Sequence, residues 1–335
     1  MSINMAYVSV IIPSYNSQET IEQCLVSVRQ STYKDYELIV VDDASSDDSC
    51  PIASKYADMV MRLTEHLGRS QARNRGIMAS AGQIIVNIDS DVVIRPDTIA
   101  RIADYFIKHP DVSAVNGLLS KEHPHPGFFS QYKNLYMHYI FNKLPEKVTF
   151  LYGSIHAFRR EDALLYGCDD MTADDTALGQ KLLAWGKQIG FIKTLEVVHL
   201  KRYNWFSFIK NDFQIPFDWG KIFLKYQGWK QLGRNKTGFA HSPKEQLIST
   251  LLAPVIILSG ILSLSGNLNY LVVLFLTVGW LLLNVNFLAF LIKERGFLFG
   301  VLAFFVTFLD NIVMACGIVC GFTAFLLRKK ICKNQ

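Results

Sequence analysis

The sequence predicts an α/β domain, built on a parallel sheet with helices on both faces, followed by a helical membrane region. Apolar runs of strand length alternate with amphipathic segments through residues 1 to about 200, which is typical of such sheets. Residues 247–327 are almost free of charge, and a membrane helix needs roughly 20 consecutive apolar residues. The 335-residue chain is therefore expected to combine a soluble part with a membrane part.

The predicted elements of the soluble part follow one another in a regular order. The first buried strand, VSVIIPSYN, ends at a proline turn, and the next segment places Ile21, Leu25 and Val28 on one helix face. The stretch YELIVVDDASSDDS predicts a second buried strand that runs into a Ser/Asp-rich cap for a short helix. GRSQARNRGIMASAG predicts a loop and a helix, and QIIVNIDSD predicts the next strand.

Polar residues directly follow three of these predicted strands. The clusters are Ser14–Asn16, Asp42–Asp43 and Asp89–Asp91. Ligands of parallel sheets bind outside the carboxyl ends of the strands, so we expect the three clusters to face one binding site. A charge at the end of a buried strand is also costly without a partner.

Asp89 and Asp91 form an Asp-x-Asp pair that suits a divalent cation. Oxygen ligands suit Mg²⁺ or Mn²⁺, and these ions usually keep coordination positions open for phosphate oxygens. A capping role in a turn is the alternative for such a pair. The apolar strand before it, the carboxylate pair upstream and the arginine-rich loop between them favour metal binding.

Residues 204–245 form a predicted segment at the membrane interface. Aromatic side chains and lysines are interleaved here, which suits helices that lie at the membrane surface. An aromatic core of a small subdomain would produce the same pattern. Further along, Gly317 and Gly321 form a GxxxG pattern that predicts a helix-packing face.

Residues 246–330 form the predicted transmembrane region. Two spans, Leu247–Ser265 and Leu268–Ile292, are clear from their length and apolar composition. A third stretch, Phe297–Leu327, is too long for a simple crossing and carries polar residues in its middle. It is either one long tilted helix or a broken hairpin.

Charge and cysteine usage predict an integral membrane protein whose soluble domain lies on the cytoplasmic face. The N-terminal apolar run is too short for a secretory signal, and the six cysteines suggest no disulfide framework. The net charge of +5 is small, and nothing in the sequence resembles a nucleic-acid-binding patch. Basic residues beside the predicted spans agree with the positive-inside rule and with contact to anionic lipids. They are Arg234, Lys236, Lys244, Lys293 and Arg295.

Taken together, the motifs resemble those of the family 2 glycosyltransferases, which have the GT-A (Rossmann-like) fold. The likeness rests on VIIPSYN, VVDDASSDDS, GRSQARNRGIMASAG and NIDSDVVIRP in the family's order and spacing, and continues in HAFRRE and TADDTALGQKL. It covers about residues 6–202. The resemblance implies that residues 1–203 are a cytoplasmic catalytic domain that binds a UDP- or GDP-linked sugar through a metal-bridged diphosphate.

The resemblance also implies which residues bind the nucleotide-sugar. Asp43 and its neighbour Asp42 are similar to the carboxylates that contact the base and ribose, although Asp42 could instead cap the following helix. The remaining positions are Pro13, Tyr15, Arg73, Asn74 and Asp89. An arginine near a diphosphate has an electrostatic reason to be there as well.

The metal site implied by the resemblance contains Asp91, Asp89 and His199, with Mn²⁺ or Mg²⁺ as the cofactor. Asp91 is the expected direct ligand, and Asp89 resembles the residue that contacts ribose or a metal-bound water. His199, in VVHL, is similar to a histidine that completes the site in related enzymes. A structural role is the alternative for a single histidine after a strand.

Asp174 and Asp175 resemble the family's Glu-Asp pair, which contains the catalytic base. A hydroxyl that attacks a sugar carbon must lose its proton, and a positioned carboxylate can accept it. Because this chain reads ADD where the family has EDD, either aspartate could be the base, and we favour Asp175. Capping of the following helix is the alternative for both.

The sequence therefore predicts an inverting, metal-dependent glycosyltransferase that transfers a hexose to a membrane-associated, lipid-linked acceptor. The Gln-x-x-Arg-Trp motif of processive synthases is absent, which favours the addition of one sugar per encounter. Polyprenyl phosphate is the alternative acceptor, and it would need no strong base. A catalytically silent membrane scaffold with a nucleotide-sugar fold is the alternative of another class.

Overall fold

The computed structural model describes residues 8–166, 174–232, 239 and 242–331. The chain forms two units, and the first contains Met1–His125 and Phe141–Lys201. The second contains Pro126–Ile140 and Arg202–Gln335. This grouping differs from the linear division at residue 203, because residues 126–140 join the C-terminal unit although they lie inside the N-terminal half of the sequence.

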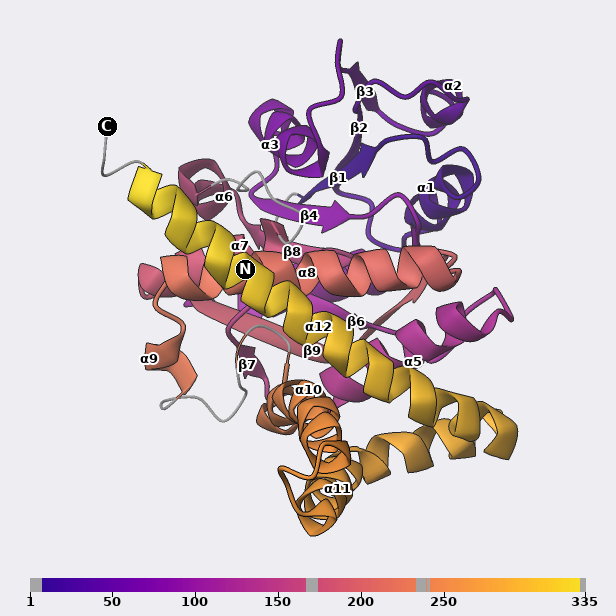
Figure 1. The fold of residues 1–335 in the computed structure, drawn as a ribbon. Coiled ribbons are helices and arrows are strands. Elements are labelled where there is room, and N and C mark those ends of the chain that lie inside the picture. Colours follow the sequence, from indigo (N-terminus) through magenta and orange to yellow (C-terminus); the bar gives the residue numbers. More distant parts are fainter. Residues whose placement is uncertain (1–7, 167–173, 233–238, 240–241, 332–335) are drawn as a thin grey trace. The chain divides into compact units, whose positions relative to one another are not determined.

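Strands form a mixed nine-stranded sheet within the described part of the first unit (Figure 1). The strand order is β3-β2-β1-β4-β8-β6-β9-β5, and β7 pairs with β9 beside this path. The strands are β1 (Val8–Ser14), β2 (Tyr36–Asp42), β3 (Met59–Arg62), β4 (Ile84–Ile88), β5 (Val92–Val93), β6 (Val112–Leu119), β7 (Lys147–Val148), β8 (Ile155–Arg159) and β9 (Gln188–His199).

The expected parallel sheet is present from β3 to β4, where all three strand pairs run parallel. Its central strand β1 is buried along its whole length, as expected for a strand covered on both faces. The sheet departs from the expectation at β8, which pairs antiparallel with both β4 and β6. The apolar run of β8 cannot reveal this direction, because a buried strand has the same composition in either orientation.

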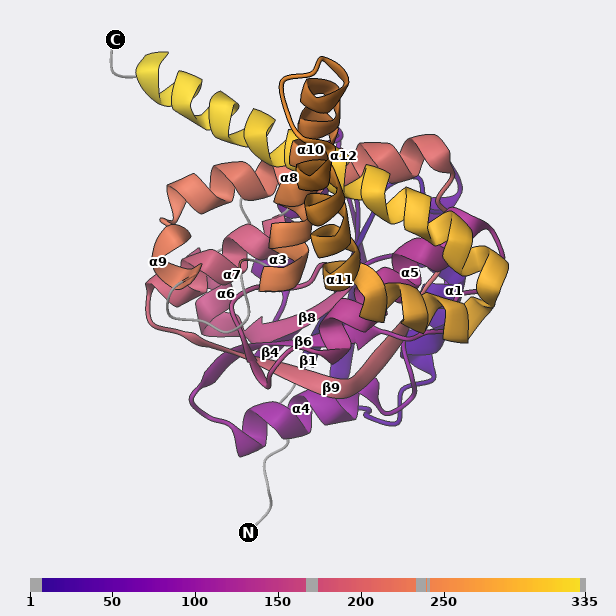
Figure 2. The ribbon, with the colours of Figure 1, turned by 60° about the horizontal axis from the view of Figure 1, so that its bottom comes forward.

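Helices cover both faces of this sheet. Figure 2 shows α4 on one side and α7 on the other. The predicted apolar face of the first helix is confirmed, since Ile21, Leu25 and Val28 are all fully buried. The helices of this unit are α1 (Ile21–Arg29), α2 (Ser49–Ala53), α3 (Arg69–Ala79), α4 (Thr98–Lys108), α6 (Arg160–Tyr166) and α7 (Asp174–Ala184).

The second unit is helical in its described residues, and three of its helices are long and apolar enough to cross a membrane. These three are α10 (Lys244–Leu264), α11 (Tyr270–Arg295) and α12 (Phe297–Ile331). The others are α5 (Phe128–Asn142, up to Ile140 in this unit), α8 (Trp205–Lys225) and α9 (Trp229–Leu232). The third apolar stretch is thus one continuous helix rather than a hairpin.

Residues 126–140 join the second unit through aromatic and polar contacts of α5. The Tyr132 hydroxyl lies 3.0 Å from the Thr307 hydroxyl of α12. The ring of Phe128 packs on that of Phe299, with centroids 4.6 Å apart. Such contacts depend on which elements meet in space, so sequence order alone does not indicate them.

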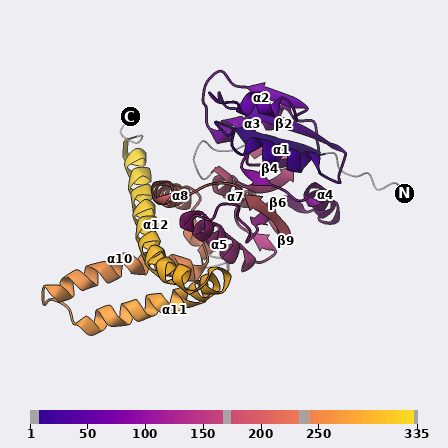
Figure 3. The same cartoon turned by 90° about the vertical axis from the view of Figure 1, so that its right-hand side faces the viewer.

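The GxxxG pattern packs within the chain, against α8 (Figure 3). A Cβ atom at Gly317 or Gly321 would collide with the backbone of α8, at the carbonyl oxygens of Phe213 and Phe217. Gly220 of α8 approaches the Ile318 carbonyl of α12 in the same way. Small residues on both helices therefore allow the two backbones to approach closely.

Side-chain amides and a hydroxyl join α10, α11 and α12. The Ser249 hydroxyl accepts hydrogen bonds from the amides of Asn284, at 2.6 Å, and Asn311, at 2.8 Å. The Gln246 amide donates to the Asn311 carbonyl oxygen at 2.9 Å. These four side chains, which we call the amide network, are buried, and their polar atoms find partners that lipid cannot supply.

Candidate functional site

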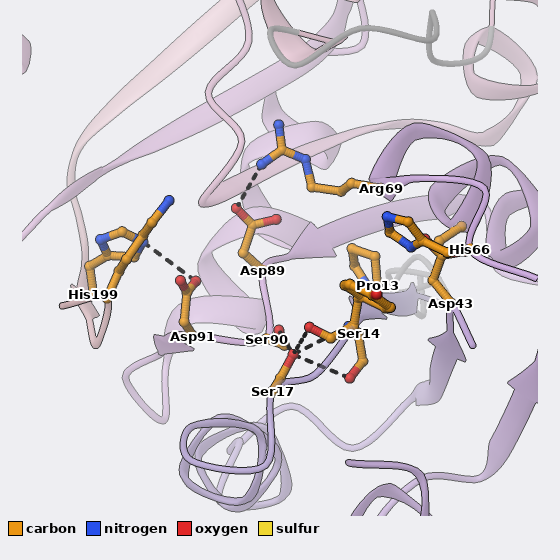
Figure 4. A pocket seen from close by; sticks show the side chains of 13 residues that line it. Pro13, Ser14, Ser17, Asp43, His66, Arg69, Asp89, Ser90, Asp91 and His199 are labelled. Carbon is orange, nitrogen blue, oxygen red and sulfur yellow. Dashed lines mark hydrogen bonds and ion pairs between the residues drawn. The ribbon is translucent and has the colours of Figure 1, made fainter. Parts of the chain in front are cut away.

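A cavity of about 250 Å³ lies at the ends of strands β1, β2, β4 and β9 (Figure 4). The structure thus brings the three predicted polar clusters together in one place. The lining comes from five separate stretches of the first unit. It includes Pro13, Ser14, Tyr15, Ser17, Asp43, His66, Arg69, Ala72, Asp89, Ser90, Asp91, His199 and Lys201.

Asp43 shapes one wall of the cavity by holding the loop before α3. Its carboxylate accepts hydrogen bonds from the backbone N–H groups of Leu67 and Gly68, both at 2.8 Å. His66 Nδ1 lies 2.9 Å from the same carboxylate, and its ring stacks on Tyr15 with centroids 3.8 Å apart. Asp43 therefore positions an exposed pair of stacked rings at the cavity.

Asp42 lies behind this wall and is fully buried. Its Oδ2 accepts a hydrogen bond from the Ser45 N–H at 3.3 Å and lies 3.6 Å from Arg62 Nε. It is not one of the residues that line the cavity. It does not cap α2 either, because the N-cap of that helix is Asp48.

Arg73 is the centre of a buried ion-pair network. It lies in α3, fully buried, and its guanidinium contacts Asp89 at 2.6 Å and Asp174 at 2.7 Å. Arg69, one helical turn earlier, contacts Asp174 at 2.8 Å. We call these four residues the arginine–aspartate network. Asn74 also lies in α3 and does not line the cavity.

The two adjacent aspartates of α7 have different surroundings. Burial alone would raise the pKa of Asp174, but the charges of Arg73 and Arg69 lower that pKa to about 2. Burial and the neighbouring charge of Asp174 raise the pKa of Asp175 to about 6. Thr172 and Ala173, the first residues of the predicted TADD motif, lie outside the described residues.

Asp175 faces the same space as Asp89. A Cβ atom at Gly153 would lie 3.0 Å from Asp175 Oδ2 and 3.6 Å from Asp89 Oδ2. The Gly153 carbonyl oxygen accepts a hydrogen bond from Arg73 at 3.0 Å, which fixes the glycine beneath both carboxylates. Only a residue without a side chain leaves this space open.

Asp91 and His199 meet because β5 pairs with the end of β9. Val92 lies opposite His199 in this ladder, and the Leu200 N–H donates to the Asp91 carbonyl oxygen at 2.7 Å. The Asp91 carboxylate and His199 Nε2 lie 3.4 Å apart. Burial alone would raise the pKa of Asp91, but His199 lowers it to about 2.

A carboxylate oxygen and an imidazole nitrogen at this separation fit a divalent cation that keeps open positions for phosphate oxygens. The predicted three-residue set is not assembled, because Asp89 is turned toward Arg73 and Arg69. Among the described residues, no group of three or more His, Cys, Asp or Glu side chains is arranged to hold a metal ion.

Sequence comparison relates this domain to known proteins. Residues 9–165 match the model of glycosyl transferase family 2. This match assigns a little under half of the chain, residues 9–165, to that family. The chain is 30% identical over 185 residues to glycosyltransferase GlyA of Streptococcus pneumoniae, and this alignment covers 54% of the chain and 24% of GlyA. It is 39% identical over 98 residues to glycosyltransferase AglE of Haloferax volcanii, which covers 27% and 32% respectively.

One of the solved structures that resemble this chain in fold matches almost its whole length. This is the mannosyltransferase PcManGT from Pyrobaculum calidifontis, in complex with GDP-Man and Mn²⁺. The superposition has a TM-score of 0.59 at 18% identity and covers 98% of this chain and 89% of that one. The predicted GT-A class of α/β fold is thereby confirmed. The chain spans less than a third of the two curated relatives above.

Three basic residues that line the cavity were not predicted from the sequence: His66, Arg69 and Lys201. Arg69 had a usable signal, since it precedes Arg73 by four residues and so shares its helix face. His66 and Lys201 lie in irregular segments between elements. Nothing in their local sequence indicates that they face the cavity.

Proposed function

We propose that the protein is a membrane-anchored, inverting glycosyltransferase that moves a hexose from a nucleotide-sugar to a hydroxyl of a lipid-linked acceptor. The observation that carries this proposal is the contrast between Asp174 and Asp175 beside the cavity. Asp174 is neutralised by two arginines, whereas Asp175 forms no ion pair with an arginine among the described residues and adjoins the space above Gly153. Two neighbouring carboxylates whose surroundings move their pKa values apart are typical of active sites in which one of them acts as the acid or base.

Asp175 is the proposed general base. With a pKa of about 6 it is ionised at neutral pH, yet more basic than an ordinary carboxylate. The acceptor hydroxyl oxygen attacks the anomeric carbon, and its proton passes to Asp175. The bond from that carbon to the diphosphate oxygen breaks on the opposite face, which inverts the configuration. The leaving group carries away the electron pair.

The cavity is the proposed site of the donor, either UDP- or GDP-linked. Tyr15 and His66 offer stacked rings to a base, and Asp43 holds the loop that carries His66. Arg69 and Lys201 line the cavity and place positive charge where a diphosphate would lie. The Pyrobaculum protein, whose solved complex contains GDP-Man and Mn²⁺, supports a donor of this class.

Asp91 and His199 are the proposed ligands of Mn²⁺ or Mg²⁺. Such a cation, when bound, offsets the negative charge that develops on the leaving diphosphate. The Asp91 carboxylate and the His199 imidazole would hold this cation, and the pairing of β5 with β9 keeps these two side chains together. Asp89 is paired with Arg73, and we propose that it contacts the ribose of the donor rather than the cation.

The acceptor is proposed to be lipid-linked and held at the cytoplasmic membrane surface. Three apolar helices anchor the chain, and Trp205 and Phe206 of α8 are 40% and 81% exposed, as suits contact with membrane lipids. A polyprenyl phosphate acceptor is already anionic and would need no base. The environment of Asp175 therefore favours a sugar hydroxyl.

The test is transfer from labelled UDP- and GDP-sugars by the purified full-length protein in lipid nanodiscs. Lipid-linked saccharides and polyprenyl phosphate are supplied separately as acceptors. We expect label on the saccharide, lost in Asp175→Asn and retained in Glu19→Gln, an exposed control on the same unit. Label only on polyprenyl phosphate, at the same rate in Asp175→Asn, would overturn the proposal.

A further inference from the structure

Two histidines outside the cavity contact the segment that carries His199. They lie in the stretch EHPHPG, where a proline follows each of them. A residue before proline is restricted to extended conformations, and alternate residues of an extended chain point to the same side. His123 and His125 accordingly lie together, with ring centroids 5.5 Å apart.

Both rings bind the backbone just after His199. His125 Nε2 lies 3.0 Å from the Leu200 carbonyl oxygen, and His123 Nε2 lies 3.2 Å from that of Lys201. A carbonyl oxygen can only accept a hydrogen bond, so each Nε2 atom must carry the hydrogen. Two successive carbonyl groups are thus held by two imidazoles.

The two histidines support one edge of the chain that follows His199. The strand that pairs with its other edge, β5, is short. On that side β5 supplies a ladder of only Val92 and Val93, together with the hydrogen bond from Leu200 N–H to Asp91. The segment is also the end of the first unit, because the chain enters the second unit at Arg202. His125 is likewise the last residue before a passage into the second unit. The two histidines therefore tie together two points at which the chain leaves the first unit.

We propose that His123 and His125 are positioning residues that hold His199 and Lys201 in the cavity. They act through the backbone carbonyl groups of residues 200 and 201 and touch neither the cation nor the donor. Their loss leaves the Asp91–His199 pair intact in composition but less well oriented, so the cation binds more weakly. The inference rests on the proposed function, since it takes Asp91 and His199 as the cation ligands.

The test is direct titration of the full-length protein in nanodiscs with Mn²⁺ alone, followed by the electron paramagnetic resonance of free Mn²⁺. We expect His125→Phe, which keeps a ring and loses the donor, to raise the Mn²⁺ Kd by roughly tenfold, as outer-shell substitutions do. His125→Gln, whose amide N–H can still reach a carbonyl, should restore most of the affinity. His109→Phe is the matched control, because His109 is exposed on the same unit.

A second measurement separates positioning from a merely structural role. If His125 positions the cation ligands, sugar transfer by His125→Phe is restored by excess Mn²⁺, whereas a general loss of folded protein persists at every concentration. Should His125→Phe fail to fold, His125→Asn, with its shorter side chain, replaces it with the same expected weakening. Wild-type affinity for Mn²⁺ in the Phe and Asn variants would overturn the inference alone. Absence of Mn²⁺ binding by the wild-type protein would overturn the proposed cation pair and the inference with it.

Discussion

The arginine–aspartate network of the first unit and the amide network of the second are both largely buried. They differ in charge and in whether they adjoin a cavity. In the first, two arginines and two aspartates pair beside an open cavity. In the second, Ser249 and three amide side chains bond mainly to one another. The neutral network joins helices, whereas the charged one also sets the electrostatic surroundings of the neighbouring Asp175.

This difference indicates where function lies. Buried ion pairs rarely stabilise a fold more than well-packed apolar side chains would, because both charges must leave water. A neutral network serves helix association at a smaller desolvation cost. A charged network beside a cavity therefore suggests a role in chemistry, and variants of the two networks should fail in different ways.

The largest expected effect is that of Asp175→Asn, which removes the proposed base and nearly preserves its shape. We expect the kcat of sugar transfer to fall by a factor of about 10²–10⁴, the usual contribution of general base catalysis. Nucleotide binding, measured by calorimetry with UDP and GDP, should change little, because Asp175 does not line the cavity in which we propose that the donor binds. An unchanged kcat would show that the different surroundings of the two aspartates play no part in catalysis.

Arg73→Met tests the charged network itself. Removing one partner of a buried pair leaves uncompensated charge, here on Asp89 and Asp174, and we expect a loss of about 3–5 kcal/mol in unfolding free energy. Arg75→Met is the matched control on the same helix, since Arg75 is exposed. Equal denaturation midpoints for the two variants would show that the network is not needed for the fold.

A smaller effect is expected from pH, and it sharpens the contrast between Asp174 and Asp175. The base must be ionised, so kcat should be constant well above pH 6 and fall as Asp175 takes up a proton, to about a tenth at pH 5. Asp174 and Asp91, with pKa values of about 2, stay ionised over this range. The acid limb should disappear from the residual activity of Asp175→Asn, and its persistence there would assign it to another group.

The sequence was informative where function follows from local pattern. Buried strands ending in polar residues predicted that Asp43, Asp89 and Asp91 would share one cavity, since parallel strands end at one edge of a sheet. The sequence was less informative about which side chains pair with one another. That Arg73 would be buried between Asp89 and Asp174 depends on contacts that span 16 positions to Asp89 and 101 positions to Asp174.

The same limit explains the departures in the fold. The direction of β8 and the joining of residues 126–140 to the second unit both depend on which elements meet in space. The GxxxG pattern predicted a packing face, but the partner, α8, is marked in sequence only by the single Gly220. His123 and His125 carry no recognisable motif, because they bind backbone carbonyl groups, which every residue offers.

The smallest expected effect is that of Ser249→Ala in the amide network. The substitution removes the acceptor shared by Asn284 and Asn311, and hydrogen bonds between membrane helices contribute about 0.6 kcal/mol each on average. We therefore expect a loss of about 1 kcal/mol in unfolding free energy in detergent micelles. The Km for the donor should not change, because none of these side chains belongs to the first unit. Thr277→Ala, on an exposed face of α11, is the control for loss of a hydroxyl that bonds within its own helix. If Ser249→Ala lowered kcat without lowering stability, the amide network would share in catalysis, and the contrast between a neutral structural network and a charged functional one would fail.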